Sequence, residues 1–348
     1  MKTYEEMCKF ENLYNAHRAA RLGKRGKTEV IKFEMNIAWN IYTLQEQLIN
    51  RTWKPLGYYH FYVHDPKTRS IFAPYYADRV VQHCLCDNIL APVLDKRLIF
   101  DNAACRIDKG THFSLKRLTQ FLADFYKKHG TKGYFLKIDI RKYFDNIDHA
   151  VLKEKLSKVF KEKDILDMLF LIIDSYEKEP DKGLPLGNQT SQWFALYYLD
   201  GLDRLIKEKF RIKYYTRYMD DFILLHGDKT YLLEILAQLR AFAAGELHIE
   251  FNEKTQIFPV LNGVKYLGFH IYLTETGKVI RKVTAQTKKR YKRLLKKMTK
   301  DYALGLIDLD FIQPRINSYT AHLKHGHTDR LRGKLARETS YVRGQKQN

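Results

Sequence analysis

The sequence feature that most constrains the fold is a pair of adjacent aspartates, Asp220 and Asp221, between two short runs typical of β-strands. Residues 213–218 and 222–225 are rich in aromatic and β-branched side chains, which predicts a hairpin with the pair at or near its turn. Two like charges ~4 Å apart repel by about 4 kcal/mol at an effective dielectric near 20. A solvated turn is one interpretation. A pair of divalent cations is the other, since Mg²⁺ prefers carboxylate and phosphate oxygens.

A third aspartate, Asp139, interrupts the apolar run at 134–140, which predicts a buried central strand. A carboxylate in such a strand is rarely tolerated unless it is paired or binds a metal. Asp139, Asp220 and Asp221 therefore form a candidate three-carboxylate metal site, the arrangement that two-metal phosphoryl transfer requires.

The charge of the chain predicts a polyanionic partner. Its 348 residues include 61 basic and 40 acidic side chains, a net charge of +21. Nucleic acid is the first candidate and an anionic membrane surface the second. The basic excess is concentrated at residues 281–348, which hold 18 basic and five acidic side chains.

The sequence predicts a cytoplasmic protein without membrane spans. No run of 18 apolar residues occurs, and the N-terminus lacks the apolar core of a signal peptide. The four cysteines show neither metal-ligand spacing nor a secreted disulfide framework, so we expect reduced thiols at Cys8, Cys84, Cys86 and Cys105.

Hydrophobic periodicity predicts helices over most of residues 1–55 and over 78–99, with two strands between them at 56–75. The turn between these strands carries Lys67 and Arg69. Such a basic hairpin can bind a triphosphate, with the Arg69 fork on phosphate oxygens. An exposed turn is the alternative.

Two further basic segments are candidate phosphate contacts. The loop at 103–112, with Arg106 and Lys109, precedes a predicted helix and suits a phosphate at the helix N-terminus, although a simple entry loop is equally compatible. A helix from about 286 keeps Tyr291 and Met298 inward and covers its remaining surface with lysines and arginines. That surface suits a duplex phosphate backbone.

Four other residues have a functional and a structural interpretation. Gly187 permits close approach of a substrate backbone, and Gln192 can bond to a base or a template phosphate. Phe144 can shield a sugar 2′ position or pack in the core. Lys254 can reach a phosphate, donate a proton, or be surface charge.

In their order along the chain these motifs resemble the palm of reverse transcriptases. The resemblance covers nearly the whole chain, because two upstream segments resemble the fingers motifs of bacterial retroelement enzymes. The matching residues are Asp139, Gly187, the Tyr-Met-Asp-Asp box at 218–221, Lys254 and the Tyr-Leu-Gly-Phe run at 266–269, with 78–82 and 104–112 upstream.

Within that family the turn at 186–192 resembles the enzymes of diversity-generating retroelements. Group II intron enzymes usually carry Gln-Gly and then Ser-Pro, whereas this chain has Leu186 in place of that Gln and Gln192 in place of that Pro. In the diversity-generating enzymes this departure accompanies low fidelity opposite template adenine. The short basic region after the palm leaves no room for intron-type extensions, which predicts a stand-alone enzyme.

The resemblance implies a role for each matching residue. Asp139, Asp220 and Asp221 become catalytic ligands of two Mg²⁺ ions, which Mn²⁺ can replace, with the Ile140 carbonyl as a further ligand. The implied dNTP contacts are Lys67, Arg69, Phe144 as a gate against ribonucleotides, Gly187 and Gln192 beside the template nucleotide, and Lys254. The expected nucleic-acid contacts are Arg106, Lys109, Lys288, Lys289 and Arg293.

The implied fold is α+β, with the right-hand architecture of polymerases. The expected segments are an N-terminal helical region at 1–55, fingers at 56–130, a palm with an antiparallel sheet at 131–275, and a basic helical thumb at 276–348.

The predicted function is RNA-directed DNA synthesis from a primer, error-prone and serving a diversity-generating retroelement. The implied partners are template RNA, the RNA/DNA duplex, dNTPs and a small basic accessory protein, with no membrane partner. A defence or retron-type reverse transcriptase is an alternative. A non-catalytic RNA-binding protein is disfavoured by the three intact carboxylates, and a nucleotidyl cyclase by the basic thumb.

Overall fold

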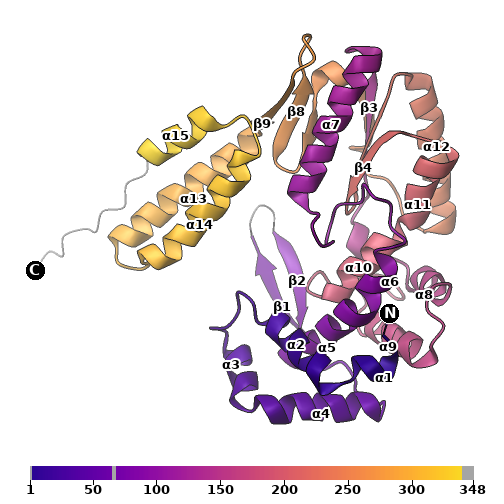
Figure 1. Cartoon of the computed structure of the whole chain (residues 1–348), viewed down its shortest axis with the longest axis vertical. Helices are drawn as coiled ribbons and strands as arrows, with labels where there is room; N and C mark the ends of the chain where they lie inside the picture. Colours follow the sequence, from indigo (N-terminus) through magenta and orange to yellow (C-terminus); the bar gives the residue numbers. More distant parts are fainter. Residues whose placement is uncertain (1, 65–67, 339–348) are drawn as a thin grey trace, which may run out of the picture.

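The computed structural model describes residues 2–64 and 68–338 and confirms the α+β class (Figure 1). The chain begins with α1 (Tyr4–Met7), α2 (Phe10–Ala20), α3 (Thr28–Met35) and α4 (Ile37–Ile49). Thr3 and Glu6 start α1 as a reciprocal capping box. The buried face of α2, which includes Leu13 and Ala16, packs against α5. The helices predicted over most of residues 1–55 are therefore present.

The predicted hairpin follows. Strands β1 (Tyr58–Val63) and β2 (Arg69–Pro74) pair antiparallel. They lead into one helical run, made of α5 (Tyr76–Leu85), the π-turn η1 (Cys86–Leu90) and α6 (Ala91–Leu94). The helix predicted over 78–99 thus starts two residues earlier and ends five earlier. Arg106 accounts for the early end, because its guanidinium bonds to both the carboxylate and the carbonyl of Asp95 and the chain turns away there.

The centre of the molecule is a four-stranded antiparallel sheet in the order β4-β5-β3-β6. Its strands are β3 (Tyr134–Asp139), β4 (Tyr214–Tyr218), β5 (Asp221–His226) and β6 (Gln256–Pro259). Strand β3 is an inner strand, as predicted. Side chains alternate along it, so Leu136 and Ile138 enter one core and Phe135 enters another.

Helices cover both faces of this sheet. One core is completed by α8 (His149–Ser157), α9 (Lys163–Asp174), α10 (Gln189–Tyr198), α11 (Asp200–Arg204) with the π-turn η3 (Leu205–Lys209), and α12 (Lys229–Glu246). On the other face, α7 (Thr111–His129) buries Leu115, Leu118 and Leu122 against Phe135 and Tyr214. Helix α7, which the sequence places in the fingers segment, therefore packs with the central sheet.

A second antiparallel sheet leads to the C-terminal helices. It consists of β7 (Val264–Tyr266), β8 (Phe269–Leu273) and β9 (Val279–Val283), after the short helix η4 (Val260–Asn262). Helices α13 (Ala285–Ala303), α14 (Leu309–Lys324) and α15 (Asp329–Glu338) then project to one side of the molecule (Figure 1). Residue 276 lies between β8 and β9, so this sheet spans the predicted thumb boundary and the helical part begins at Ala285.

Two general expectations can be compared with the described residues. No helix within residues 2–64 and 68–338 is long and apolar enough to cross a membrane. Cys8, Cys84, Cys86 and Cys105 all carry free thiols, and the first three are buried.

Candidate active site

The turn between β4 and β5 carries two of the candidate ligands. Tyr218 pairs with Asp221 across the strands, so Met219 and Asp220 are the two central residues of the hairpin turn. Met219 has a φ of 54°, and only this first central position is left-handed. That is the sign pattern of a type II′ turn, in which glycine is favoured at this position. A methionine there is strained, so its surroundings have to hold the turn in place.

The register of the central sheet brings the third candidate to the same point. Asp139, the last residue of β3, lies directly opposite Asp221, the first residue of β5. Side chains paired in this way point to one face, with Cβ atoms about 5 Å apart. Asp139 is half-buried rather than buried, because the strand ends there. Ile140, whose carbonyl is the predicted fourth ligand, follows it and forms an isolated bridge with Phe251.

Burial and mutual repulsion perturb these carboxyl groups. Burial raises the pKa of Asp221 to about 6; Lys137 opposes the rise, and the charges of Asp220 and Asp139 add to it. Burial also raises the pKa of Asp220, with Asp139 adding to the shift and Arg69 opposing it. A shift of this kind in a cluster of acids is typical of a site stabilised by additional positive charge.

The donor set fits a hard divalent cation, since it offers carboxylate oxygens and no thiol or imidazole. The observation that points to a cation is Oδ1 of Asp221, which is buried and accepts no hydrogen bond. Lys137 neutralises this carboxylate in part, with Nζ 3.2 Å from both oxygens and a further bond of 2.8 Å to the Lys265 carbonyl. Within the described residues no three ligating side chains already converge as they do in an assembled metal site.

A cavity of about 680 Å³ opens beside the turn. Four predicted residues from four separate segments line it: Arg69 in β2, Phe144 in the short helix η2 (Tyr143–Asn146), Gln192 in α10, and Asp220. Its volume is typical of a small-molecule site, which is about 300–1,000 Å³. A cation, an aromatic ring and a carboxylate around one cavity suit a ligand that carries phosphate groups and a base.

Two cations at this cavity were not predicted, Lys142 and Lys178. Lys142 has a left-handed backbone, with a φ of 43°, at the start of η2. It follows Asp139 by only three residues, and that short spacing was the available signal. Lys178 had no such signal, because it lies in the loop after α9, far from every recognised motif.

The structure gives Gly187 a close neighbour other than the predicted substrate. A Cβ atom at Gly187 would lie 2.3 Å from the Phe72 carbonyl oxygen and 2.7 Å from the Ala73 Cα atom. The Gly187 N–H also donates to the Phe72 carbonyl at 3.2 Å. The missing side chain thus lets the turn before α10 pack closely on β2. Gly187 is not among the described residues that line the 680 Å³ cavity.

Another predicted dNTP contact, Lys254, is not among the described residues that line the cavity. Lys254 is exposed in the loop before β6, and its N–H donates to Oδ1 of Asn252 at 3.1 Å. The Asn252 N–H donates to the Asp139 carbonyl at 2.7 Å, which anchors this loop behind the end of β3. Lys67 lies outside the described residues.

The predicted nucleic-acid contacts of the loop before α7 have partners inside the protein. The Arg106 side chain is only 6% exposed, and it bonds to Asp95 and to two further backbone carbonyls. Lys109 donates to the Phe100 carbonyl at 2.6 Å and lies over the Phe100 ring. Arg106 therefore stabilises this loop, and its contact with nucleic acid stays a prediction.

The C-terminal candidates share one helix. Lys288, Lys289 and Arg293 all lie on α13, and their side chains are exposed. Lys289 and Arg293 are four residues apart and so lie on the same face. Their contact with a duplex stays a prediction.

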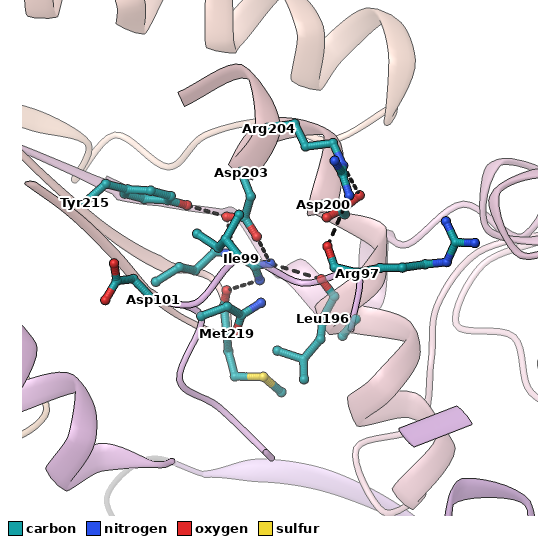
Figure 2. Close-up of polar contacts among 12 residues, drawn as sticks. Arg97, Ile99, Asp101, Leu196, Asp200, Asp203, Arg204, Tyr215 and Met219 are labelled. Atoms are coloured by element: carbon teal, nitrogen blue, oxygen red, sulfur yellow. Dashed lines mark hydrogen bonds and ion pairs between the residues drawn. The ribbon is translucent and has the colours of Figure 1, made fainter. Parts of the chain in front are cut away.

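Behind the turn lies a buried ion pair that the sequence did not reveal. Arg217 and Asp203 are both fully buried, with Nε 2.8 Å from Oδ1 and Nη2 2.5 Å from Oδ2. The Tyr215 hydroxyl donates to the same carboxylate at 2.5 Å. The remaining guanidinium bonds reach the carbonyls of Met219 at 2.9 Å and Leu196 at 3.0 Å. Figure 2 shows Asp203 of α11, Leu196 of α10, Tyr215 of β4 and Met219 of the turn around these bonds.

Residues 64–271 match the family described as "Reverse transcriptase (RNA-dependent DNA polymerase)". The match covers more than half of the chain and includes Asp139, Asp220 and Asp221.

Individual relatives are distant. The chain is 27% identical over 96 residues to the putative COX1/OXI3 intron 2 protein of Saccharomyces cerevisiae, covering 26% of this chain and 11% of that protein. It is 23% identical over 208 residues to the group II intron-encoded protein LtrA of Lactococcus lactis subsp. cremoris, covering 56% of this chain and 33% of that protein. The chain thus spans at most a third of the length of these relatives.

A solved structure shares the fold. Apo telomerase from Candida tropicalis superposes with a TM-score of 0.51 at 14% identity, covering 83% of this chain and 60% of that chain. At this identity the likeness shows the fold alone, which is the right-hand polymerase fold.

Proposed function

Because the chain belongs to the reverse transcriptase family, we propose that it is an RNA-directed DNA polymerase that extends a primer with dNTPs. The observation that carries the proposal is the pairing of Asp139 with Asp221 at the end of the central sheet, with Asp220 in the adjacent turn. Beside them, the 680 Å³ cavity offers Arg69 and Phe144 to a nucleotide.

The chemistry follows from the residues around this cavity. Asp139, Asp220 and Asp221 would hold two Mg²⁺ ions, which would lower the pKa of the primer 3′-hydroxyl and neutralise charge on the triphosphate. Arg69 and Lys142 are placed to bind phosphate oxygens of the incoming nucleotide. Phe144 lines the same cavity, which supports its proposed role as a gate against the ribose 2′-hydroxyl. The 3′-oxygen forms its bond to the α-phosphorus as the bond to pyrophosphate breaks, without a covalent protein intermediate.

The finer proposal is error-prone synthesis for a diversity-generating retroelement. It is supported by Leu186 and Gln192, the two residues on which that resemblance rests, because both line the same cavity as Asp220. Side chains at these positions are therefore placed to influence how a template base and an incoming nucleotide fit together. The proposed partners are a template RNA, its duplex with the new DNA, and a small basic accessory protein.

The principal test is Asp220→Asn, which keeps the side-chain volume and removes the charge. We expect templated dNTP incorporation to fall by about 100-fold or more, because loss of one preorganised charged group at a transition state costs about 10²–10³ in rate. Binding of primed RNA should be retained. Asp167→Asn, at an exposed position on α9, is the matched control and should leave incorporation unchanged. Near wild-type incorporation by Asp220→Asn would rule out the metal assignment.

The finer proposal needs a separate test. Gln192→Pro and Leu186→Gln each restore the residue of the intron-type turn. We expect them to change the misincorporation spectrum opposite template adenine more than they change template affinity. Sequencing of products made on a defined RNA template measures this. An error spectrum identical to that of the wild type would remove the fidelity role of the turn.

A further inference from the structure

We propose that Arg217 is a positioning residue for the metal site. Through its bond to the Met219 carbonyl, and anchored by Asp203, it holds the turn in the conformation that presents Asp220 and Asp221 to divalent cations. This inference deepens the proposed function and rests on it.

Arg217 bonds to the peptide group at the centre of the turn. The Met219 carbonyl belongs to the peptide plane that joins Met219 to Asp220, and Nη1 of Arg217 donates to it at 2.9 Å. Fixing this plane fixes the direction in which the chain enters Asp220. The restraint is needed because Met219 occupies a left-handed conformation that favours glycine.

The side chain of Arg217 is itself held in place by bonds to two helices. Its Nε and Nη2 atoms fork onto the Asp203 carboxylate of α11, and Nη2 also bonds to the Leu196 carbonyl of α10. Tyr215 supports the carboxylate from β4 (Figure 2). A planar fork held by two helices is a rigid support for the turn.

The backbone of Arg217 is held as well. Strand β4 is an edge strand, and residues 101–103 cover that edge: the Arg217 N–H donates to the Asp101 carbonyl at 3.1 Å, and the Ala103 N–H donates to the Arg217 carbonyl at 3.0 Å. The side chain is fully buried, so it cannot touch a substrate. Any effect on the reaction has to pass through the turn.

An apolar side chain in place of Arg217 would lack the hydrogen bond to the Met219 carbonyl. Apolar residues of similar volume often replace a buried ion pair without loss of stability. They would fill the space between α10, α11 and β4, but they would not donate to the Met219 carbonyl. The directional donor is therefore the specific contribution of Arg217.

The test distinguishes the effect of losing the hydrogen bond to the Met219 carbonyl from the effect of losing stability. The paired variant Arg217→Met with Asp203→Leu removes both charges together and keeps the bulk. We expect primed-RNA affinity and the KM for dNTP to stay near wild type. We expect kcat, and the affinity for Mn²⁺ titrated into the primed-RNA complex by electron paramagnetic resonance, to fall by about 10- to 100-fold, the usual effect of losing a residue that orients a metal ligand.

Two further variants make the result decisive. Tyr215→Phe removes a bond to Asp203 but none to the turn and none between Asp203 and Arg217, and should lower kcat and Mn²⁺ affinity much less than Arg217→Lys does. Arg217→Lys keeps the charge beside Asp203, but a single ammonium cannot reproduce the fork and the bond to Met219 together. It should weaken Mn²⁺ binding even if the paired variant does not fold.

Wild-type Mn²⁺ affinity in Arg217→Lys or in the folded paired variant overturns the inference, and so does an equal loss in Tyr215→Phe. Failure of the wild-type protein to extend any primed RNA would instead refute the proposed function. The Mn²⁺ titration still judges the role of Arg217 in that case, because it does not depend on turnover.

Discussion

Replacing Asp203 by alanine is expected to lower the free energy of unfolding by about 4 kcal/mol. The substitution removes both bonds to Arg217 and the bond from Tyr215, and it leaves a fully buried guanidinium without a counter-charge. Loss of one partner from a buried ion pair costs about 3–5 kcal/mol. The truncated side chain also leaves a cavity, which places the expected loss in the upper part of that range.

The matched control has the same kind of contact in a different environment. The carboxylate of Glu154 on α8 lies 2.6 Å from the ammonium of Lys158, the C-cap of that helix, but the two side chains are 67% and 69% exposed. Glu154→Ala should therefore change the urea midpoint far less than Asp203→Ala does, because solvent screens an exposed ion pair. Urea unfolding, followed by fluorescence of the buried Trp193 on α10, measures both. If Asp203→Ala lost less than about 1 kcal/mol, or no more than Glu154→Ala, the argument from burial would be wrong.

Three other predictions concern single positions. Burial raises the pKa of Asp78 from 3.8 to about 6, so the protonated carboxyl contributes fully to the free energy of unfolding below pH 3.8, and this contribution is lost as the pH rises through 6. Asp78→Asn should abolish this decline in the free energy of unfolding, which is up to about 3 kcal/mol and is measured as urea midpoints against pH. Gly187→Ala should destabilise the protein by about 1–3 kcal/mol and raise the KM for dNTP, because its Cβ would meet the Phe72 carbonyl at 2.3 Å. Lys137→Met should raise the pKa of Asp221 further, so more of this carboxyl is protonated at pH 6.5 and the half-activating Mg²⁺ concentration should rise there but not at pH 8.5. The same half-activating concentration in the variant and the wild type at pH 6.5 would contradict this.

Local patterns were sufficient for most elements and for the identity of the candidate ligands. The strand at 134–139 and the hairpin around Asp220 follow from alternation of side chains and from two acids at a turn. The register that sets Asp139 against Asp221 is different, because it depends on how β3 and β5 align after both cores have formed. The sequence could therefore name three acids, but only the structure shows that two of them are a cross-strand pair.

Two candidate contacts, Gly187 and Arg106, have partners inside the protein that the sequence did not reveal. The sequence predicts Gly187 at the dNTP and Arg106 at a nucleic-acid phosphate, because a glycine in a turn and an arginine in a loop are typical of binding sites. In the structure the first makes room for β2 and the second bonds to carbonyls of its own loop. The partners of both residues are backbone atoms, and no sequence pattern marks a backbone carbonyl that lacks a donor. Contacts of this kind become visible only when segments distant in sequence are brought together.

Lys137 and Arg217 both bond to residues of the turn that carries the proposed metal ligands, and they act on different atoms. Lys137 lies on the carboxylate of Asp221, whereas Arg217 bonds to the peptide behind Asp220. A divalent ion that binds Asp221 has to compete with Lys137 for the same oxygens, but it leaves every bond of Arg217 intact. Lys137 therefore acts on the charge of Asp221, whose pKa it lowers, while Arg217 keeps the turn in one conformation with or without the ion. It follows that Lys137→Met and Arg217→Lys should both weaken Mn²⁺ binding at low pH. At high pH, where Asp221 is ionised in either variant, only Arg217→Lys should still weaken it, because Lys137→Met then removes a competing cation.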